Sequence, residues 1–221
     1  MRFRPTARFR AGILFLSILP LVMIPAVNAA TTSAGDILVP EFWRTRHPGP
    51  YTLKVVLVVD EEWSARFGVD ARRQALAIMH SAGEVFAPAN IRLDVVSYGS
   101  WVSPDGSNGI HDMYRDLQSV PRGEADMVVA LTAQYHGQEG GIAATGNRHV
   151  LIKHHSYRPD QDALVAAHEI GHLLGLHHHG CPHLYCVMYS HYYDERRHFC
   201  PDHLRLLQAN GGLFQYLDSL N

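Results

Sequence analysis

The pattern of hydrophobic and polar positions along the chain predicts strands that alternate with helices. Short apolar runs rich in β-branched residues predict strands, and apolar positions three and four residues apart predict helices. The predicted strands cover residues 52–60, 91–98, 127–132 and 150–153, with 141–144 as an edge strand. The predicted helices cover residues 69–87, 111–120, 160–176 and 202–210, the last closed by Gly211 and Gly212. This alternation predicts an α/β fold with a twisted, mostly parallel sheet.

The first 50 residues do not share this pattern. Four arginines open the chain, residues 11–27 form an apolar run, and small residues end at Ala29. This order predicts a secretory signal peptide over residues 1–29 that is cleaved after Ala29. The run is short for a membrane span, and Pro20 and Pro25 interrupt it, which argues against an anchor. Residues 30–50 are expected to be a leader or linker, and residues 51–221 to form one domain.

Composition and charge narrow the function further. Hydrophobic residues make up 47% of the chain and charged residues 18%, which is typical of a globular protein. The net charge of −2 becomes −6 once the four arginines of the signal peptide are removed, so nucleic-acid binding is not expected. No later segment is long and apolar enough to span a bilayer, and the mature protein is therefore expected to be secreted or periplasmic. Nine of the 16 histidines fall within residues 168–203, which points to a metal.

The candidate chemistry lies between His168 and His178. Residues four apart share one face of a helix, so His168 and His172 can bind one ion together. Gly175 can adopt a left-handed conformation and turn the chain, which lets His178 approach as the third ligand. Three imidazoles and a water form an open four-coordinate site, the arrangement of a catalytic zinc. Glu169 follows the first histidine directly and can reach that water as a general base.

This HExxHxxGxxH pattern resembles that of the metzincin zinc metallopeptidases, in which a methionine-containing turn follows beneath the metal. Met188 stands ten residues after His178 and fits that turn. The resemblance covers roughly residues 52–203, and its specific part is residues 165–190. It implies a zincin-like catalytic domain over residues 51–221, with an upper subdomain over about 51–178 and a small irregular lower subdomain over about 179–221.

The subfamily stays open. Cys181, Cys186 and Met188 have a spacing similar to that of archaemetzincins, in which cysteines near this turn hold a second zinc. Cys200 and His203 would complete a Cys₃His set for such a structural ion. In an oxidising compartment, the alternative is one disulfide and one spare thiol. A tyrosine directly after Met188 is a feature similar to matrixins.

The resemblance implies a secreted or periplasmic zinc-dependent endopeptidase that acts on peptides or proteins. Glu169 would activate a zinc-held water, and the strand at 141–144 would hold an extended peptide. The alternative is a periplasmic zinc-binding or zinc-buffering protein without activity, which would not need Glu169. The remaining histidines are expected at the surface or on a secondary metal: His154, His155, His183, His191 and His198.

Overall fold

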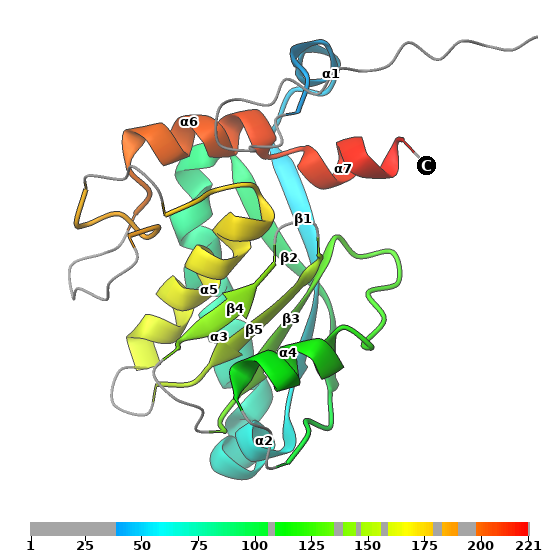
Figure 1. Cartoon of the computed structure of the whole chain (residues 1–221), viewed down its shortest axis with the longest axis vertical. Helices are drawn as coiled ribbons and strands as arrows, with labels where there is room; N and C mark the ends of the chain where they lie inside the picture. Colours follow the sequence, from blue (N-terminus) through cyan, green and yellow to red (C-terminus); the bar gives the residue numbers. More distant parts are fainter. Residues whose placement is uncertain are drawn as a thin grey trace, which may run out of the picture.

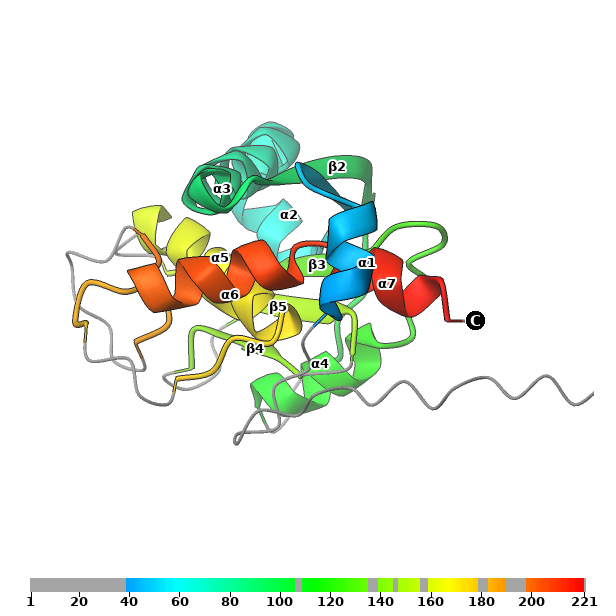
Figure 2. The same ribbon diagram turned by 90° about the horizontal axis from the view of Figure 1, so that it is seen from above.

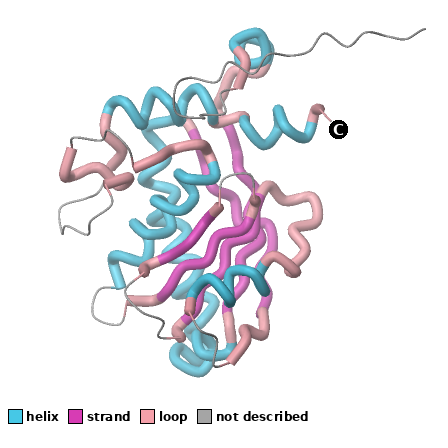
Figure 3. The backbone as a smooth tube through the Cα atoms, viewed as in Figure 1, coloured by secondary structure: helices cyan, strands magenta, loops and turns pink. Residues whose placement is uncertain are grey.

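A computed structural model describes residues 39–105, 109–134, 139–144, 147–155, 159–178, 183–189 and 198–220. The predicted signal peptide and most of the predicted leader lie outside these residues. The described chain forms one five-stranded sheet in the order β2-β1-β3-β5-β4 (Figures 1 and 3). Four strands are parallel, and β4 pairs antiparallel with β5 at one edge, which confirms the predicted fold class. The strands are β1 (Tyr51–Val59), β2 (Ile91–Ser100), β3 (Met127–Thr132), β4 (Gly141–Ala143) and β5 (His149–Lys153).

Helices cover both faces of the sheet. Helices α3 (Ala71–Phe86) and α5 (Pro159–Leu173) pack on one face, and α4 (Ile110–Leu117) packs on the other (Figure 2). Alternate residues of β1 serve the two layers, because Leu57 packs in the cluster with α3 and α5 while Val58 packs with α4. Every residue of β3 and β5 is buried, as expected for strands covered on both sides.

Three short helices, α1 (Glu41–Arg46), α2 (Glu61–Phe67) and α7 (Leu213–Asp218), were not predicted from the sequence. Helix α2 follows β1 directly, and the Asp60 side chain caps it by accepting a hydrogen bond of 2.7 Å from the Trp63 backbone N–H. Helix α7 follows α6 (Pro201–Asn210) after only two glycines. Single-turn 3₁₀ segments at Gly68–Asp70 and Ala87–Ala89 flank α3.

The end of the predicted leader contains a helix, α1 (Glu41–Arg46), that packs on the C-terminal part of the chain. Trp43 is 8% exposed and lies edge-on to the Tyr216 ring. Gly211 and Gly212 are needed here for space: a Cβ at Gly211 would overlap the Tyr51 ring, and one at Gly212 would lie 2.5 Å from the Trp43 ring. The predicted boundary of the catalytic domain at residue 51 stays a prediction. Helix α1, which precedes this boundary, packs against the C-terminal part of the domain.

Helix α6 is fixed against the end of α5 by one buried amide. The Asn210 side chain donates a 3.0 Å hydrogen bond to the Leu174 carbonyl, and its oxygen accepts one of 3.3 Å from the Val39 backbone. The Asn210 side chain therefore joins α6 and the segment at Val39 to the C-terminal end of the helix that carries the histidine motif. Within the described part of the chain, no helix has the length and apolar character needed to cross a bilayer.

Candidate active site

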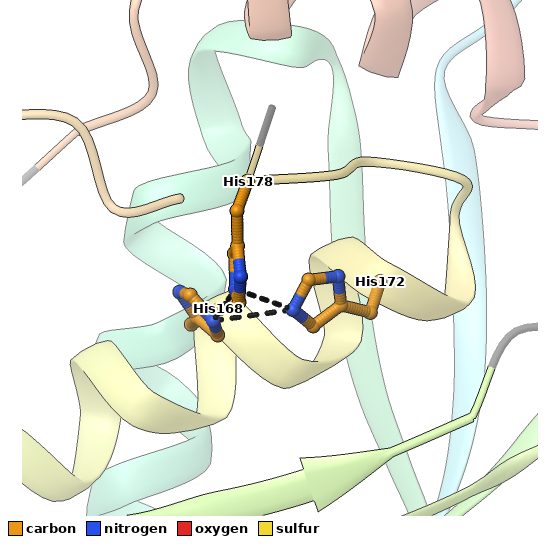
Figure 4. A group of neighbouring side chains, drawn as sticks. All are labelled: His168, His172 and His178. Atoms are coloured by element: carbon orange, nitrogen blue, oxygen red, sulfur yellow. Dashed lines mark hydrogen bonds between the residues drawn. The ribbon is translucent and has the colours of Figure 1, made fainter. Parts of the chain in front are cut away.

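The end of α5 is built to bring three histidines together. The helix carries His168 and His172 and ends at Leu173. Gly175 follows with φ of +84°, and the Leu176 and Gly175 backbone N–H groups bond back to the carbonyls of residues 171 and 172, each at 3.0 Å. These bonds form a Schellman motif, which reverses the chain after the helix. The reversal carries His178 back over the helix face, as predicted (Figure 4).

The three side chains converge on one point through their Nε2 atoms. The separations between these atoms are 3.2 Å for His168 and His172, 3.0 Å for His172 and His178, and 2.8 Å for His168 and His178. Two nitrogens that share one zinc ion at about 2.0–2.1 Å lie roughly 3.3 Å apart in a tetrahedral site. The observed triangle is slightly tighter and fits one ion.

Backbone carbonyls fix the proton on two of these rings. His168 Nδ1 lies 2.7 Å from the Val187 carbonyl, and His172 Nδ1 lies 2.8 Å from the Leu176 carbonyl. A carbonyl oxygen can only accept, so each Nδ1 carries the proton and each Nε2 presents a lone pair. Two lone pairs facing each other at 3.2 Å repel unless a cation lies between them. The donor set is therefore suited to a divalent transition metal, and its imidazole chemistry suits zinc.

Burial keeps His172 in the neutral form that a metal requires. Loss of water around the ring lowers the pKa of His172 to about 4, although its hydrogen bond to the Leu176 carbonyl opposes the change. A neutral imidazole at ordinary pH leaves its Nε2 lone pair available for coordination.

Glu169 directly follows His168 on α5 and is buried, with 7% of its surface exposed. Burial raises the pKa of Glu169 to about 8, opposed by a hydrogen bond from the Ala143 backbone and reinforced by the negative charge of Glu139. A cation held by the three histidines would favour the charged carboxylate. The carboxyl group of Glu169 is thus held away from bulk water.

The edge strand β4 is pressed against this part of α5. A Cβ at Gly141 would lie 2.8 Å from Glu169 Cγ and 2.9 Å from Val165 Cγ1, so only glycine allows the approach. The far end of β4 is held by Tyr114, whose hydroxyl accepts a 3.1 Å hydrogen bond from the Ala144 backbone and donates one of 3.2 Å to the His149 carbonyl. The sequence analysis predicted the strand but neither of these restraints.

Met188 packs against α5 at Gly171, inside the histidine motif. Its predicted place in a turn beneath the metal stays a prediction. Its side chain is fully buried, and its sulfur would lie 2.7 Å from a Cβ placed on Gly171. Gly171 therefore has a spacing role inside the motif that the pattern of ligands does not reveal. The methionine packs under the turn that separates His168 from His172.

A second cluster of potential ligands lies next to Met188. Cys186, Cys200 and His203 place their donor atoms within 4.8 Å of one another, and all three residues are buried. His203 Nδ1 lies 3.2 Å from Cys186 Sγ and 3.3 Å from Cys200 Sγ, and the structure records both cysteines as buried thiols. Burial also lowers the pKa of His203. The sequence analysis grouped these residues with Cys181, which lies outside the described residues.

One of the remaining histidines departs from the expected surface position. The His154 side chain is 5% exposed, and its Nδ1 lies 2.6 Å from Oδ2 of Asp162, which is itself buried. The Asp162 carboxylate also accepts a hydrogen bond of 2.9 Å from the His155 backbone. Through Asp162, the pair ties the segment before α5 to the first turn of that helix.

Comparison with known proteins identifies the family. Residues 49–205 match the family described as Reprolysin_5, metallo-peptidase family M12. The chain belongs to this family. This M12 metallopeptidase is also 30% identical over 170 residues to a Homo sapiens protein, "A disintegrin and metalloproteinase with thrombospondin motifs 14". That match covers 66% of the chain but only 14% of the human protein.

These matches confirm the predicted metzincin-type zinc metallopeptidase and leave its subfamily open. A solved structure titled "Structure of a chaperone-substrate complex" superposes with a TM-score of 0.57 over 75% of this chain and 35% of the other, at 15% sequence identity. At that identity the likeness concerns the fold alone. The family that the chain matches is one of metallopeptidases.

Proposed function

We propose that this M12 metallopeptidase is a secreted endopeptidase whose single catalytic zinc is held by His168, His172 and His178, with Glu169 as the general base. The observation that carries the proposal is the convergence of three Nε2 atoms within 2.8–3.2 Å, two of them from the helix that also carries the buried Glu169. Three protein ligands leave one coordination position for water or substrate, as a catalytic zinc site requires.

The proposed mechanism divides the work between the metal and Glu169. When bound, zinc supplies Lewis acidity, which polarises the scissile carbonyl and lowers the pKa of a water molecule to about 7. Glu169 accepts the proton of that water as it attacks the carbonyl carbon. The same carboxyl group then gives the proton to the nitrogen of the leaving amine when the C–N bond breaks. Burial suits Glu169 to both tasks, because it raises the proton affinity of the carboxylate.

The edge strand β4 is the proposed place for the substrate. It pairs with β5 on one side, and no described strand pairs with its other side. An extended peptide can bind there through backbone hydrogen bonds. Because Gly141 touches Glu169, a peptide on this edge would run directly past the general base.

A zinc-buffering function is less well supported by the same residues. Storage of zinc needs neither a carboxylate beside the ligands nor a glycine that brings an edge strand against that carboxylate. Burial of the Glu169 carboxyl group costs free energy, and storage of zinc would gain nothing from this burial. The membership of family M12 also favours the enzyme.

We further propose a second ion at Cys186, Cys200 and His203. Sulfur and nitrogen that share one zinc ion lie about 3.5 Å apart, given zinc–sulfur and zinc–nitrogen lengths of roughly 2.3 and 2.0–2.1 Å. The observed separations of 3.2 and 3.3 Å fit this arrangement. The Cys200 backbone N–H lies 3.3 Å from Cys186 Sγ, a contact that favours a thiolate. Thiolates with one imidazole suit zinc.

Metal removal tests both sites in one experiment. Elemental analysis of the intact protein should give two zinc ions per chain, and a strong chelator should abolish cleavage of a mixed peptide library. Added zinc should restore the cleavage. Cleavage that persists in protein shown to be free of zinc would contradict the catalytic proposal, and one ion per chain would contradict the second site.

Export is expected from the N-terminal sequence. The charged opening, apolar run and small residues ending at Ala29 predict that the exported protein begins at Ala30. Sequencing the N-terminus of protein recovered outside the cytoplasm measures this directly. A mature protein that retains Met1 would show that the segment is not removed.

A further inference from the structure

We infer that the cluster of Cys186, Cys200 and His203 is a positioning centre for the catalytic histidines, so that the two sites bind metal cooperatively. The inference rests on the proposed function, because it assigns one ion to each cluster. It concerns how the second ion acts on the first, through two short connections that each contain a contact between an imidazole nitrogen and a backbone carbonyl.

The first connection runs from Cys186 to His168. Val187 follows Cys186, and its carbonyl accepts the 2.7 Å hydrogen bond that fixes the His168 ring. The Val187 N–H in turn bonds to the His198 carbonyl at 3.0 Å, which ties this segment to the one that carries Cys200. An ion bound to both thiolates would clamp these two segments together. The clamp would hold the Val187 carbonyl at the position that the first catalytic ligand requires.

The second connection runs from His203 to His178. His203 uses Nδ1 toward the two sulfurs, and its Nε2 lies 3.2 Å from the His177 carbonyl. His177 immediately precedes His178, which is the third ligand and the one most exposed to solvent. A metal on Nδ1 would fix the proton on Nε2 as a donor to that carbonyl. The second ion would thereby orient the chain that delivers His178.

Together the two connections restrain two of the three catalytic ligands. His172 needs no such restraint, since its Nδ1 partner is the Leu176 carbonyl within the helix-ending turn itself. Loss of a group that orients a metal ligand typically lowers metal affinity 10- to 100-fold. We expect loss of the second ion to weaken zinc binding by the histidines by at least about 10-fold. Because coupling between sites is reciprocal, loss of the catalytic ion must weaken the second site by the same factor.

The test uses the full mature chain loaded with zinc or cobalt. Cobalt at the cysteine cluster gives a near-ultraviolet band from sulfur-to-metal charge transfer, whereas cobalt on histidines alone gives only weaker visible bands. Chelator competition then measures the affinity of each site separately, without any need for peptidase activity.

Three variants distinguish coupling between the two metal sites from a general effect of truncating a buried side chain. Cys200→Ala removes a ligand but leaves both hydrogen-bonded connections in place, and should lose the charge-transfer band and bind zinc at the histidines at least 10-fold more weakly. His203→Cys supplies another thiolate and should keep the second ion. Val58→Ala is the control for a buried truncation of similar size, because Val58 packs against α4 in a separate cluster, and it should leave both affinities unchanged.

The reciprocal measurement does not alter the cysteine cluster and stays decisive if Cys200→Ala fails to fold. His172→Ala should weaken cobalt binding at the cysteines, as Cys200→Ala weakens zinc binding at the histidines. Unchanged affinity at the partner site in both variants would overturn the inference, as would a parent that lacks the charge-transfer band or has the mass of a disulfide. A parent with two coupled ions that cleaves no peptide would instead refute the proposed function and leave this inference standing.

Discussion

Changing Glu169 to glutamine should remove most of the peptide cleavage while zinc stays bound. Glutamine has nearly the size and helix propensity of glutamate, and the three imidazoles are untouched. What is lost is the carboxylate that accepts the proton of the attacking water, and a positioned general base typically contributes about 10²- to 10⁴-fold in rate. The measurement is a paired assay of zinc content and peptide cleavage on the variant and the parent.

Two further variants are compared with Glu169→Gln. Glu84→Gln is the matched control, since it makes the same exchange on the exposed face of α3 and should leave the rate unchanged. His172→Ala should lose zinc and cleavage together, because it removes a ligand. Cleavage at the parental rate by zinc-loaded Glu169→Gln would refute the proposed role of this residue.

Changing Gly141 to alanine should lower cleavage by about 100-fold without removing zinc, because displacement of reacting groups by roughly 1 Å can cost that much. The new Cβ would lie 2.8 Å from Glu169 Cγ, 2.9 Å from Val165 Cγ1 and 3.0 Å from the Leu151 carbonyl. Backbone lies on one side of it, so the strand or the general base must move. The rate constant for cleavage, with zinc content measured alongside, tests this expectation.

Gly99→Ala is the control for a glycine within a strand. A Cβ at Gly99 would meet only Val58 Cγ1, at an ordinary contact distance of 3.9 Å. This variant should cleave at the parental rate. Parental cleavage by Gly141→Ala as well would mean that the contact between β4 and Glu169 has no part in positioning the general base.

The elements with strong periodicity were predicted well from the sequence. The third strand was predicted at its observed bounds, and α5 within three residues, because a buried strand and an amphipathic helix each leave a clear hydrophobic pattern. Helices α1 and α7 leave no such pattern. They are six residues long and form where Trp43 packs over Gly212, a contact between positions far apart in the chain. Helix α2 did have a signal, in the capping residue Asp60.

The same distinction applies to the site. The convergence of the histidines follows from the four-residue spacing on a helix and from Gly175, both of which can be read locally. The close approaches at Gly141 and Gly171 and the carbonyl of Val187 depend on which segments fold against α5. A sequence pattern can therefore indicate candidate ligands, but not the residues that position them. The sequence could predict that Cys186, Cys200 and His203 lie close together, because all three are residue types that bind metal.

The brevity of β4 has a consequence for self-association. Along one side of a strand only every second residue turns its N–H and C=O outward, so the three residues Gly141–Ala143 offer at most two such positions. Long open edges invite a second copy to add its own strand, and short edges are one of the ways in which proteins avoid this. A three-residue edge is too small a template for stacking chains into aggregates. A peptide bound there as proposed would rely on side-chain contacts in addition to these few backbone hydrogen bonds.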